Sequence, residues 1–249
     1  MALIRAESIV VEFPIYGTRH RSLKHAFIRT ATGGLLARDA AERIVVRALD
    51  GLTFSFHEGD RVGIIGHNGS GKTTLLRVLT GAYEPVSGSI EIRGRVASML
   101  SVNLGMDMEA TGYENIFLRA AVMGLKPAEV RPLVDEICEF SELGDYLEMP
   151  LRTYSSGMAM RLMFAISTCI PADIILMDEW LSVGDSAFSE KAQRRLQRLL
   201  GQAKILVVAS HDGQLIRNNC NKIMRLDHGT LIGLEELSAE QGERLSPVV

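Results

Sequence analysis

One glycine-rich octapeptide carries the clearest chemical signal in the chain. It reads Gly66-His67-Asn68-Gly69-Ser70-Gly71-Lys72-Thr73 and lies between an apolar run at 61–65 and a helical pattern at 73–79. Glycines in such a loop let backbone N–H groups turn inward around phosphate oxygens, and the dipole of the following helix favours the anion. Lys72 would reach the β- and γ-phosphates of a nucleotide, the Thr73 hydroxyl would ligate Mg²⁺, and Thr74 extends the polar start of the helix. A chance match to a glycine-rich turn is the alternative.

Two adjacent carboxylates form a second candidate element. Four apolar residues at 174–177 predict a buried central strand, and Asp178 and Glu179 follow it directly. Ligands of open α/β sheets bind beyond the carboxyl ends of the strands, so we expect this pair beside the phosphate loop. Asp178 would hold Mg²⁺, and Glu179 would polarise the attacking water as general base. The alternative is that Glu179 only pairs with a basic side chain.

The elements that must position these residues alternate between strand and helix patterns. Continuous apolar runs at 61–65, 174–177 and 205–209 are typical of buried parallel strands. Strand patterns also occupy 4–13, 44–56 (with a turn near Asp50-Gly51), 90–92 and 96–100, and helical periodicity occupies 114–168 and 186–200. A small hairpin is expected at 224–232 around His228-Gly229. The prediction is an α/β domain, with its core at 1–106 and 173–249 and an inserted helical subdomain at 107–172.

A basic segment at 17–43 interrupts the strand patterns near the start of the chain. Its charged residues are Arg19, Arg21, Lys24, Arg29, Arg38 and Arg43 against only Asp39 and Glu42. Within it, 22–32 could form a short amphipathic helix. Two interpretations stay open: a solvated surface insertion, or a surface that attracts anionic lipid headgroups or a pyrophosphate-linked substrate.

Composition narrows the class of protein. A net charge of −3 favours neither nucleic acid nor an anionic membrane as a partner. No stretch approaches the roughly 18 consecutive apolar residues of a membrane span, and we expect no signal peptide. Cys138, Cys169 and Cys220 are widely spaced and are predicted to be reduced thiols. A membrane role would therefore need a separate membrane-embedded partner.

Three further motifs make the chain resemble the ATP-binding subunits of ABC transporters over nearly its whole length. Tyr154-Ser155-Ser156-Gly157-Met158, before a helix expected to start near Ala159, resembles the ABC signature, whose usual form is Leu-Ser-Gly-Gly-Gln. His211, after the strand at 205–209, resembles the switch histidine, and Ser182-Val183-Gly184-Asp185 resembles the loop that couples two sites across a dimer. The resemblance implies the phosphate-loop NTPase fold of ABC ATPases, with an antiparallel β subdomain beside the α/β core.

The resemblance also implies roles in a nucleotide-sandwiching homodimer. Ser155 and the Gly157 backbone, at a helix N-terminus, would bind the γ-phosphate of the nucleotide on the opposite subunit. His211 would contact the γ-phosphate and orient Glu179 and the attacking water. Simpler interpretations are that Ser155 is an ordinary helix N-cap, which is compatible with binding phosphate, and that His211 is structural.

Adenine is expected to stack on Phe13, which lies where the family places an aromatic ring. Tyr16 is a rival for this role, and Phe13 could instead belong to the core. The nucleotide and Mg²⁺ site predicted from all motifs consists of Phe13, Gly66, Asn68, Gly69, Ser70, Gly71, Lys72, Thr73, Thr74, Ser155, Gly157, Asp178, Glu179, Asp185 and His211.

Several stretches are typical of the polysaccharide exporters within this family. They are 11–17 with 21–24, 111–116, 154–162 and 178–188. The long insertion before the phosphate loop fits the O-antigen exporters best in a branch that also includes capsule and teichoic-acid exporters. By this resemblance the chain would power export of a lipid-linked polysaccharide from the cytoplasmic face of the inner membrane. Its helical insertion and the loop at 101–107 would dock on a separate transmembrane permease, present in two copies.

Some positions depart from the family pattern. Trp180 replaces a proline, Ser156 a glycine and Met158 a glutamine, and the polysaccharide branch tolerates such changes. Ser101 occupies the place of a Gln or Glu that contacts Mg²⁺ and the attacking water, with Asn103 as a candidate substitute. This second departure puts Mg²⁺ handling and coupling at that loop in question.

Other functions remain as alternatives to O-antigen export. The cargo could be capsule polysaccharide, teichoic acid or a small molecule. A soluble ABC ATPase acting on DNA or ribosomes is disfavoured because the sequence has neither long coiled-coil arms nor a second fused motor. An inactive regulatory paralogue is disfavoured because Lys72, Asp178, Glu179 and His211 are all present. We expect no C-terminal carbohydrate-binding domain of the kind that some O-antigen exporters carry, so polymer length is expected to be controlled elsewhere.

Overall fold

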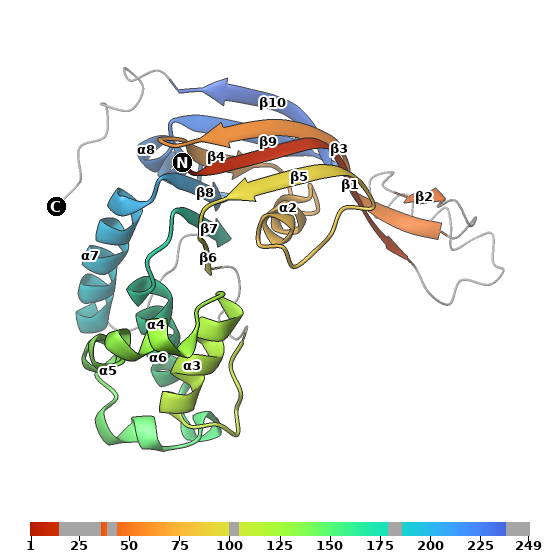
Figure 1. Cartoon of the computed structure of the whole chain (residues 1–249). Coiled ribbons are helices and arrows are strands. Elements are labelled where there is room, and N and C mark those ends of the chain that lie inside the picture. Colours follow the sequence, from red (N-terminus) through yellow and green to blue (C-terminus); the bar gives the residue numbers. More distant parts are fainter. Residues whose placement is uncertain (15–35, 39–43, 100–104, 179–185, 238–249) are drawn as a thin grey trace. The chain divides into compact units, whose positions relative to one another are not determined.

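The computed structural model describes residues 1–14, 36–38, 44–99, 105–178 and 186–237 (Figure 1). The chain divides into two compact units, the first comprising Met1–Gly94, Met177–Glu179 and Lys204–Val249 and the second Arg95–Leu176 and Trp180–Ala203. The subdomain boundaries expected around 107–172 stay a prediction. Among the described helices, none combines the length and the apolar composition needed to cross a bilayer.

An antiparallel sheet forms one part of the first unit. Its strands, in the spatial order β2-β3-β1-β5, are β1 (Leu3–Pro14), β2 (Leu36–Arg38), β3 (Ile44–His57) and β5 (Ser87–Arg93). β1 is central, and Ile4 lies opposite both Phe56 on β3 and Ile92 on β5. Because side chains alternate between the faces of a strand, Ile4 and Ala6 are buried while Arg5 and Glu7 are exposed.

The turn expected near Asp50-Gly51 is wrong, because β3 continues through both residues as one strand. Gly51 has φ of 68°, a conformation that glycine adopts without steric cost. The register with β1 shifts between Ile9 and Val11, on the opposite strand. A β-bulge of this kind takes up extra residues without ending the pairing, so a dipeptide that signals a turn lies inside a strand.

A second sheet in the first unit contains the parallel strands that carry the phosphate loop. The strands of this sheet that lie wholly in the first unit are, in spatial order, β10 (Thr230–Glu236), β9 (Lys222–Asp227), β4 (Arg61–Ile65) and β8 (Ile205–Ala209). β4 pairs in parallel with both β8 and β9, and β9 pairs antiparallel with β10. Every residue of β8 is buried, which explains a continuous apolar run in place of an alternating one. The predicted parallel strand at 205–209 and the terminal hairpin are confirmed.

Two helices of the first unit pack against these strands. They are α2 (Lys72–Leu79) and α8 (Gly213–Asn219). α2 begins at the end of the phosphate loop and buries its apolar side chains, which include Leu75 and Leu79. α8 lies so close to β4 that a Cβ atom on Gly63 would collide with the side chain of Ile216. The glycine in the run Arg-Val-Gly-Ile-Ile is therefore needed for the approach of α8.

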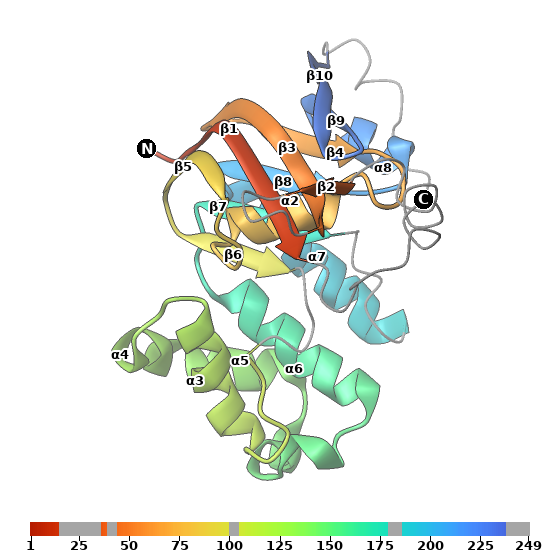
Figure 2. The ribbon, with the colours of Figure 1, turned by 90° about the vertical axis from the view of Figure 1, so that its right-hand side faces the viewer.

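The second unit is mainly helical, with α3, α4, α5 and α6 gathered in one group (Figure 2). Its helices are α3 (Gly112–Val122), α4 (Pro127–Val130), α5 (Val134–Ser141), α6 (Ser156–Cys169) and α7 (Ser186–Gln202), with 3₁₀ turns at Arg131–Leu133, Gly144–Glu148 and Leu151–Thr153. It also contains β6 (Val96–Met99) and β7 (Ile174–Asp178), whose last two residues belong to the first unit. The helices expected within 114–168 and at 186–200 are confirmed.

An aromatic cluster forms part of the core of the second unit. The rings of Phe140, Phe164 and Phe188, from α5, α6 and α7, lie with centroids 5.6 to 6.3 Å apart. In the same unit, Arg119 of α3 is buried and donates to Ser167 Oγ of α6 at 2.9 Å. Burial lowers the pKa of Arg119 to about 10, so its guanidinium stays charged at neutral pH.

All three cysteines are free thiols, as predicted. Burial raises the pKa of Cys169 and of Cys220 to about 12. Because the thiolate is the nucleophile, neither residue is suited to covalent chemistry at neutral pH.

Candidate functional site

The phosphate loop connects β4 to α2 in the first unit. Gly69 and Gly71 have φ of 83° and 103°, conformations that L side chains rarely adopt. A Cβ atom on Gly71 would also lie 2.7 Å from the carbonyl oxygen of Ala48. Gly71 occupies the N-cap position of α2 and supplies no side-chain cap. The first N–H groups of this helix have no acceptor inside it, and their dipoles favour an anion.

Ser70 gives the loop a second feature suited to phosphate. Its side chain is fully buried, and its Oγ has no hydrogen-bond partner among the described residues. Its backbone is held in place by the bonds Ser70 N to His67 O, 3.1 Å, and Gly229 N to Ser70 O, 3.0 Å. An unpaired buried hydroxyl is costly, and a phosphate oxygen in the loop would supply its partner.

Lys72 lies across the loop. The residue is 8% exposed, and its Nζ donates to the carbonyl oxygens of Gly66 at 2.7 Å and His67 at 3.0 Å. These bonds hold the ammonium group among the loop carbonyls, where the sequence places a phosphate-binding charge. The amino group of a lysine can redirect its donors to phosphate oxygens because it is a compact charge on a flexible stem.

Thr73 and Asp178 come together from separate segments of the first unit. Thr73 Oγ1, in the first turn of α2, donates to Asp178 Oδ2, at the end of β7, with a distance of 2.7 Å. A hydroxyl and a carboxylate are oxygen ligands of the kind that Mg²⁺ takes in phosphate-loop sites. The two residues predicted to ligate Mg²⁺ are therefore neighbours, and their donor set fits the ion.

His211 follows β8, which lies beside β4 in the sheet. The backbone on either side of it is fixed, since Ser210 N donates to Ile64 O at 3.3 Å and Asp212 N donates to Ser210 Oγ at 3.0 Å. The His211 residue itself is exposed. Because β4 and β8 are parallel, His211 and Gly66 lie at the same edge of the sheet.

Phe13 lies near the end of β1 and contacts a residue that the sequence analysis did not single out. Its ring packs edge-on against Tyr83 with centroids 5.2 Å apart. Arg77 of α2 donates to the Tyr83 hydroxyl at 2.8 Å and lies 5.5 Å from the ring centre. Tyr83 carries no motif in the sequence, so only the folded chain shows that it extends the aromatic surface at Phe13.

The signature segment belongs to the second unit. Ser155 is the N-cap of α6, and its Oγ accepts from Met158 N at 3.2 Å. α6 begins at Ser156 and not near Ala159, because this cap starts the helix directly after Ser155. Gly157 lies in the first turn, where an added Cβ would meet only Ser155 Oγ, at 3.9 Å.

Several other predicted positions lie outside the described residues. They are Tyr16 and most of the basic segment 17–43, Ser101 and Asn103, and Glu179, Trp180 and Asp185. The structure thus brings together the phosphate loop, Thr73 and Asp178, and it places Ser155 and Gly157 in the other unit.

Comparisons with known proteins bear on both the family and the cargo. The ABC transporter family matches residues 49–182. The O-antigen export system ATP-binding protein RfbE of Yersinia enterocolitica is 44% identical over 90% of this chain and 94% of its own length. RfbB of Myxococcus xanthus, also an O-antigen export system ATP-binding protein, is 39% identical over 91% of this chain and 52% of its own length. The teichoic acids export ATP-binding protein TagH of Staphylococcus haemolyticus is 35% identical over 92% of this chain and 82% of its own length.

Solved structures support the fold. The ATP-binding cassette MJ0796, as a dimer in a post-hydrolysis state with ADP and Pi, matches with a TM-score of 0.66 over 95% of this chain and 99% of its own. The sequence identity is 20%, so this likeness concerns the fold alone. The predicted ABC ATPase fold is confirmed.

Proposed function

The chain belongs to the ABC transporter family, and from this membership we propose that it is the ATP-hydrolysing subunit that powers export of a lipid-linked O-antigen polysaccharide. The polymer would cross the inner membrane through a separate permease, present in two copies, with this chain on the cytoplasmic face. The 44% identity to RfbE over nearly the whole of both chains supports the choice of cargo. The observation that carries the catalytic part of the proposal is the hydrogen bond between Thr73 and Asp178.

The phosphate loop provides the binding half of the site. Lys72 would exchange its bonds to the loop carbonyls for the β- and γ-phosphate oxygens, and Ser70 Oγ would gain its missing partner. Thr73 and Asp178 would hold Mg²⁺ between their oxygens. When bound, Mg²⁺ neutralises charge on the phosphates and thereby lowers the barrier to cleavage of the terminal phosphoanhydride. Phe13, extended by Tyr83, would stack on adenine.

Glu179 and His211 would provide the hydrolytic half. Glu179 directly follows Asp178 in the sequence and would accept a proton from the attacking water. His211, at the neighbouring edge position, would orient that water and contact the γ-phosphate. Asn103 or Ser101 would complete the surroundings of Mg²⁺ in place of the usual Gln or Glu.

A second copy of the chain would complete each site. Ser155 and Gly157 lie at the N-terminus of α6, which favours an anion. In the proposed homodimer they would close over the γ-phosphate held by the opposite subunit, and Asp185 would couple the two sites. ATP binding would close the dimer and hydrolysis would reopen it, and the permease would receive that motion.

The catalytic proposal is tested by Mg²⁺-dependent ATP hydrolysis, measured on the chain alone and on the chain co-expressed with its membrane partner. We expect Glu179→Gln to abolish turnover while leaving nucleotide binding intact, because it removes the base but keeps the shape of the side chain. It should also trap an ATP-bound dimer, visible by size-exclusion chromatography with light scattering. Wild-type chain that binds ATP but hydrolyses none, even with its partner, would overturn the assignment as a motor.

Teichoic-acid export is the second candidate for the cargo, because TagH is 35% identical over most of both chains. The two cargoes differ chemically, since teichoic acids are poly(polyol phosphates) and O-antigens are glycans. We expect cells in which the wild-type chain is replaced by Glu179→Gln to accumulate a lipid-linked glycan without phosphodiester repeats. Accumulation of a phosphodiester-linked polymer would instead select the teichoic-acid cargo.

A further inference from the structure

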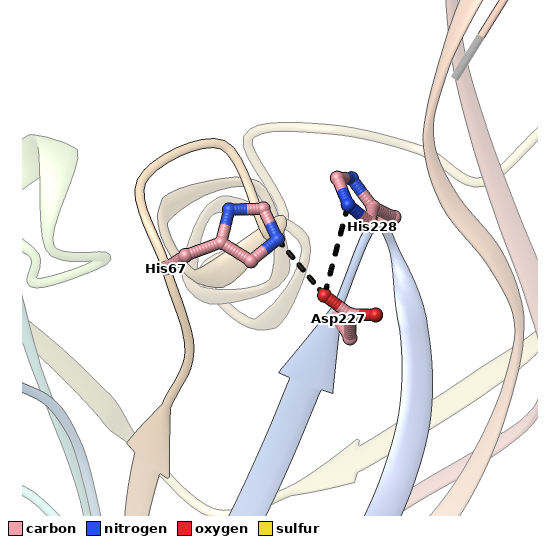
Figure 3. A group of neighbouring side chains, drawn as sticks. All are labelled: His67, Asp227 and His228. Carbon is pink, nitrogen blue, oxygen red and sulfur yellow. Dashed lines mark hydrogen bonds and ion pairs between the residues drawn. The ribbon is translucent and has the colours of Figure 1, made fainter. Parts of the chain in front are cut away.

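Three ligand-type side chains converge beside the phosphate loop (Figure 3). His67 belongs to the loop, and Asp227 and His228 lie at the turn between β9 and β10. One ligand atom from each residue lies within 4.8 Å of the others. His67 Nε2 is 2.9 Å and His228 Nε2 is 3.8 Å from the same oxygen, Asp227 Oδ1. None of these residues has a role in the proposed ATPase chemistry.

The hydrogen bonds of His67 show that this arrangement calls for a cation. His67 Nδ1 lies 2.7 Å from the carbonyl oxygen of Asn68, which can only accept, so Nδ1 carries the proton of a neutral ring. Nε2 then presents a lone pair to Asp227 Oδ1, which is also an acceptor. Two lone pairs at 2.9 Å repel each other unless a positive charge lies between them, either a proton on Nε2 or a metal ion.

The position of His228 favours a metal ion over a shared proton. A proton between His67 and Asp227 needs only those two groups, whereas His228 directs a third ligand atom at the same oxygen (Figure 3). His228 has φ of 44°, in the left-handed region that Asn or Gly adopts more readily in a two-residue hairpin turn. The turn therefore carries a ligand-type side chain where a residue better suited to its backbone would be expected.

The environment of His228 supports the same conclusion. Its Nδ1 is buried and has no hydrogen-bond partner in the described structure. That nitrogen is thus not used in hydrogen bonding among the described residues, and the centroid of its ring lies 4.5 Å from that of His67. A role in packing would not require two histidines and an aspartate to meet at one oxygen.

From this geometry we propose that His67, Asp227 and His228 form a binding site for a divalent transition-metal ion of the zinc class. Adjacent ligands of a tetrahedral zinc ion are about 3.4 Å apart when the bonds to nitrogen and oxygen are about 2.0–2.1 Å long. The separations of 2.9 and 3.8 Å lie on either side of this value, so small side-chain rotations would form the site. Imidazole ligands favour such ions over Mg²⁺, which prefers oxygen. Asn68 O would fix the tautomer of His67, a common role of carbonyls around metal sites.

The site would join the phosphate loop to the end of the second sheet. The same turn already contacts the loop through its backbone, because Gly229 N donates to Ser70 O at 3.0 Å. A metal ion coordinated by His67 and by the side chains of the turn would add a second link between the turn and the loop. Metal occupancy would therefore restrict the loop that the proposed ATPase uses, and the cation would differ from the Mg²⁺ expected at Thr73 and Asp178.

The test is a titration of the full chain, nucleotide-free and untagged, with Zn²⁺ in the presence of excess Mg²⁺. Binding is measured by isothermal titration calorimetry. We expect saturable binding of one Zn²⁺ per chain, and Co²⁺ in its place should give visible absorption bands of a low-coordinate site. His228→Asn removes one ligand while suiting the left-handed conformation, and it should weaken binding by at least about tenfold. His57→Asn is the matched control, because His57 is an exposed histidine outside the cluster, and it should leave binding unchanged.

Two results would overturn the proposal. One is the absence of Zn²⁺ binding by the wild-type chain, which would leave a proton as the shared charge between His67 and Asp227. The other is equal binding by wild type and His228→Asn. Thermal unfolding of each variant without metal shows whether the fold is kept, and Asp227→Asn provides a second ligand deletion if His228→Asn unfolds. Because no nucleotide or membrane partner is present, the outcome is independent of the proposed transport function.

Discussion

The two helix N-termini proposed to bind phosphate differ in how their first turns are satisfied. α2 follows Gly71, which supplies no side-chain cap, and the Oγ of the neighbouring Ser70 has no partner in the described part of the chain. α6 follows Ser155, whose hydroxyl accepts from Met158 N at 3.2 Å. One N-terminus thus has no side-chain cap and lies beside an unpaired hydroxyl, whereas the other is capped by its own chain.

This difference favours an order of events. A helix end without a cap and a buried hydroxyl without a partner both cost stability that a bound anion restores, so α2 is suited to bind nucleotide within a single chain. The N-terminus of α6 is stable without any ligand. Its glycine-flanked turn would engage a phosphate only when a second subunit presents one, which agrees with nucleotide binding before dimer closure.

The largest expected effect is that of Lys72→Ala on the α2 end. Removing the ammonium group that lies among the loop carbonyls should lower ATP turnover by about 10²–10³-fold, the usual loss for one donor that stabilises developing charge. Turnover is measured by the release of phosphate, and ATP binding is measured separately with a fluorescent ATP analogue.

The control is Lys191→Ala, which removes a lysine that pairs with Glu142 in the second unit, at 2.5 Å. It should keep nearly full turnover. If Lys72→Ala hydrolysed ATP as fast as Lys191→Ala, the open N-terminus of α2 would not be the phosphate site, and the comparison between the two helix ends would lose its basis.

Gly71→Ala should have the next largest effect, on stability. The new methyl group would meet Ala48 O at 2.7 Å, in a conformation with φ of 103°, so we expect a loss of about 2–3 kcal/mol in the free energy of unfolding. Gly81→Ala is the control, because Gly81 has φ of 76° but nothing within 4 Å of its added Cβ. It should cost only about 1 kcal/mol. Equal losses in urea denaturation would show that close packing around the α2 cap is unimportant.

Ser155→Ala should destabilise the α6 end by about 1 kcal/mol, the usual cost of a lost N-cap. It should leave the ATP affinity of the single chain unchanged while lowering turnover, because its phosphate would come from the other subunit. Thr111→Ala removes the comparable cap of α3 and should cost similar stability without affecting turnover. A Ser155→Ala variant that loses ATP affinity as a monomer would contradict the division of labour between the two ends.

Local patterns in the sequence placed the N-terminus of α2 correctly but not that of α6. The phosphate loop was predicted at the right residues because glycines, a preceding apolar strand and a following helix all occur within one short stretch. The bulge at Gly51 was missed because it depends on pairing with β1, and Asp-Gly looks the same in a turn and in a bulge. The start of α6 was misplaced because its first turn, Ser-Gly-Met-Ala at 156–159, carries little apolar periodicity, although the Ser155 cap starts the helix there.

Contacts that join distant segments could not be predicted in the same way. His67 lies 160 residues before Asp227, and they meet because β4 and β9 are parallel neighbours. That register depends on how the whole sheet assembles, and neither histidine carries a metal-like spacing in the sequence. The contact between Phe13 and Tyr83 has the same origin, since it joins the end of β1 to the loop after α2.

Gly157→Ala should have the smallest effect on stability, and with the opposite sign. Its added Cβ meets nothing closer than Ser155 Oγ at 3.9 Å, and alanine is a better helix former, so the free energy of unfolding should rise by about 0.5–1 kcal/mol. Turnover should nevertheless fall, because a methyl group keeps the phosphate of the other subunit from the backbone. Gly201→Ala, in α7 with open space around its Cβ, should add stability and leave turnover unchanged. If Gly157→Ala alone gains stability and loses turnover, the N-terminus of α6 binds phosphate and is not merely capped. If Gly157→Ala and Gly201→Ala both gain stability and both keep their turnover, α6 is an ordinary helix.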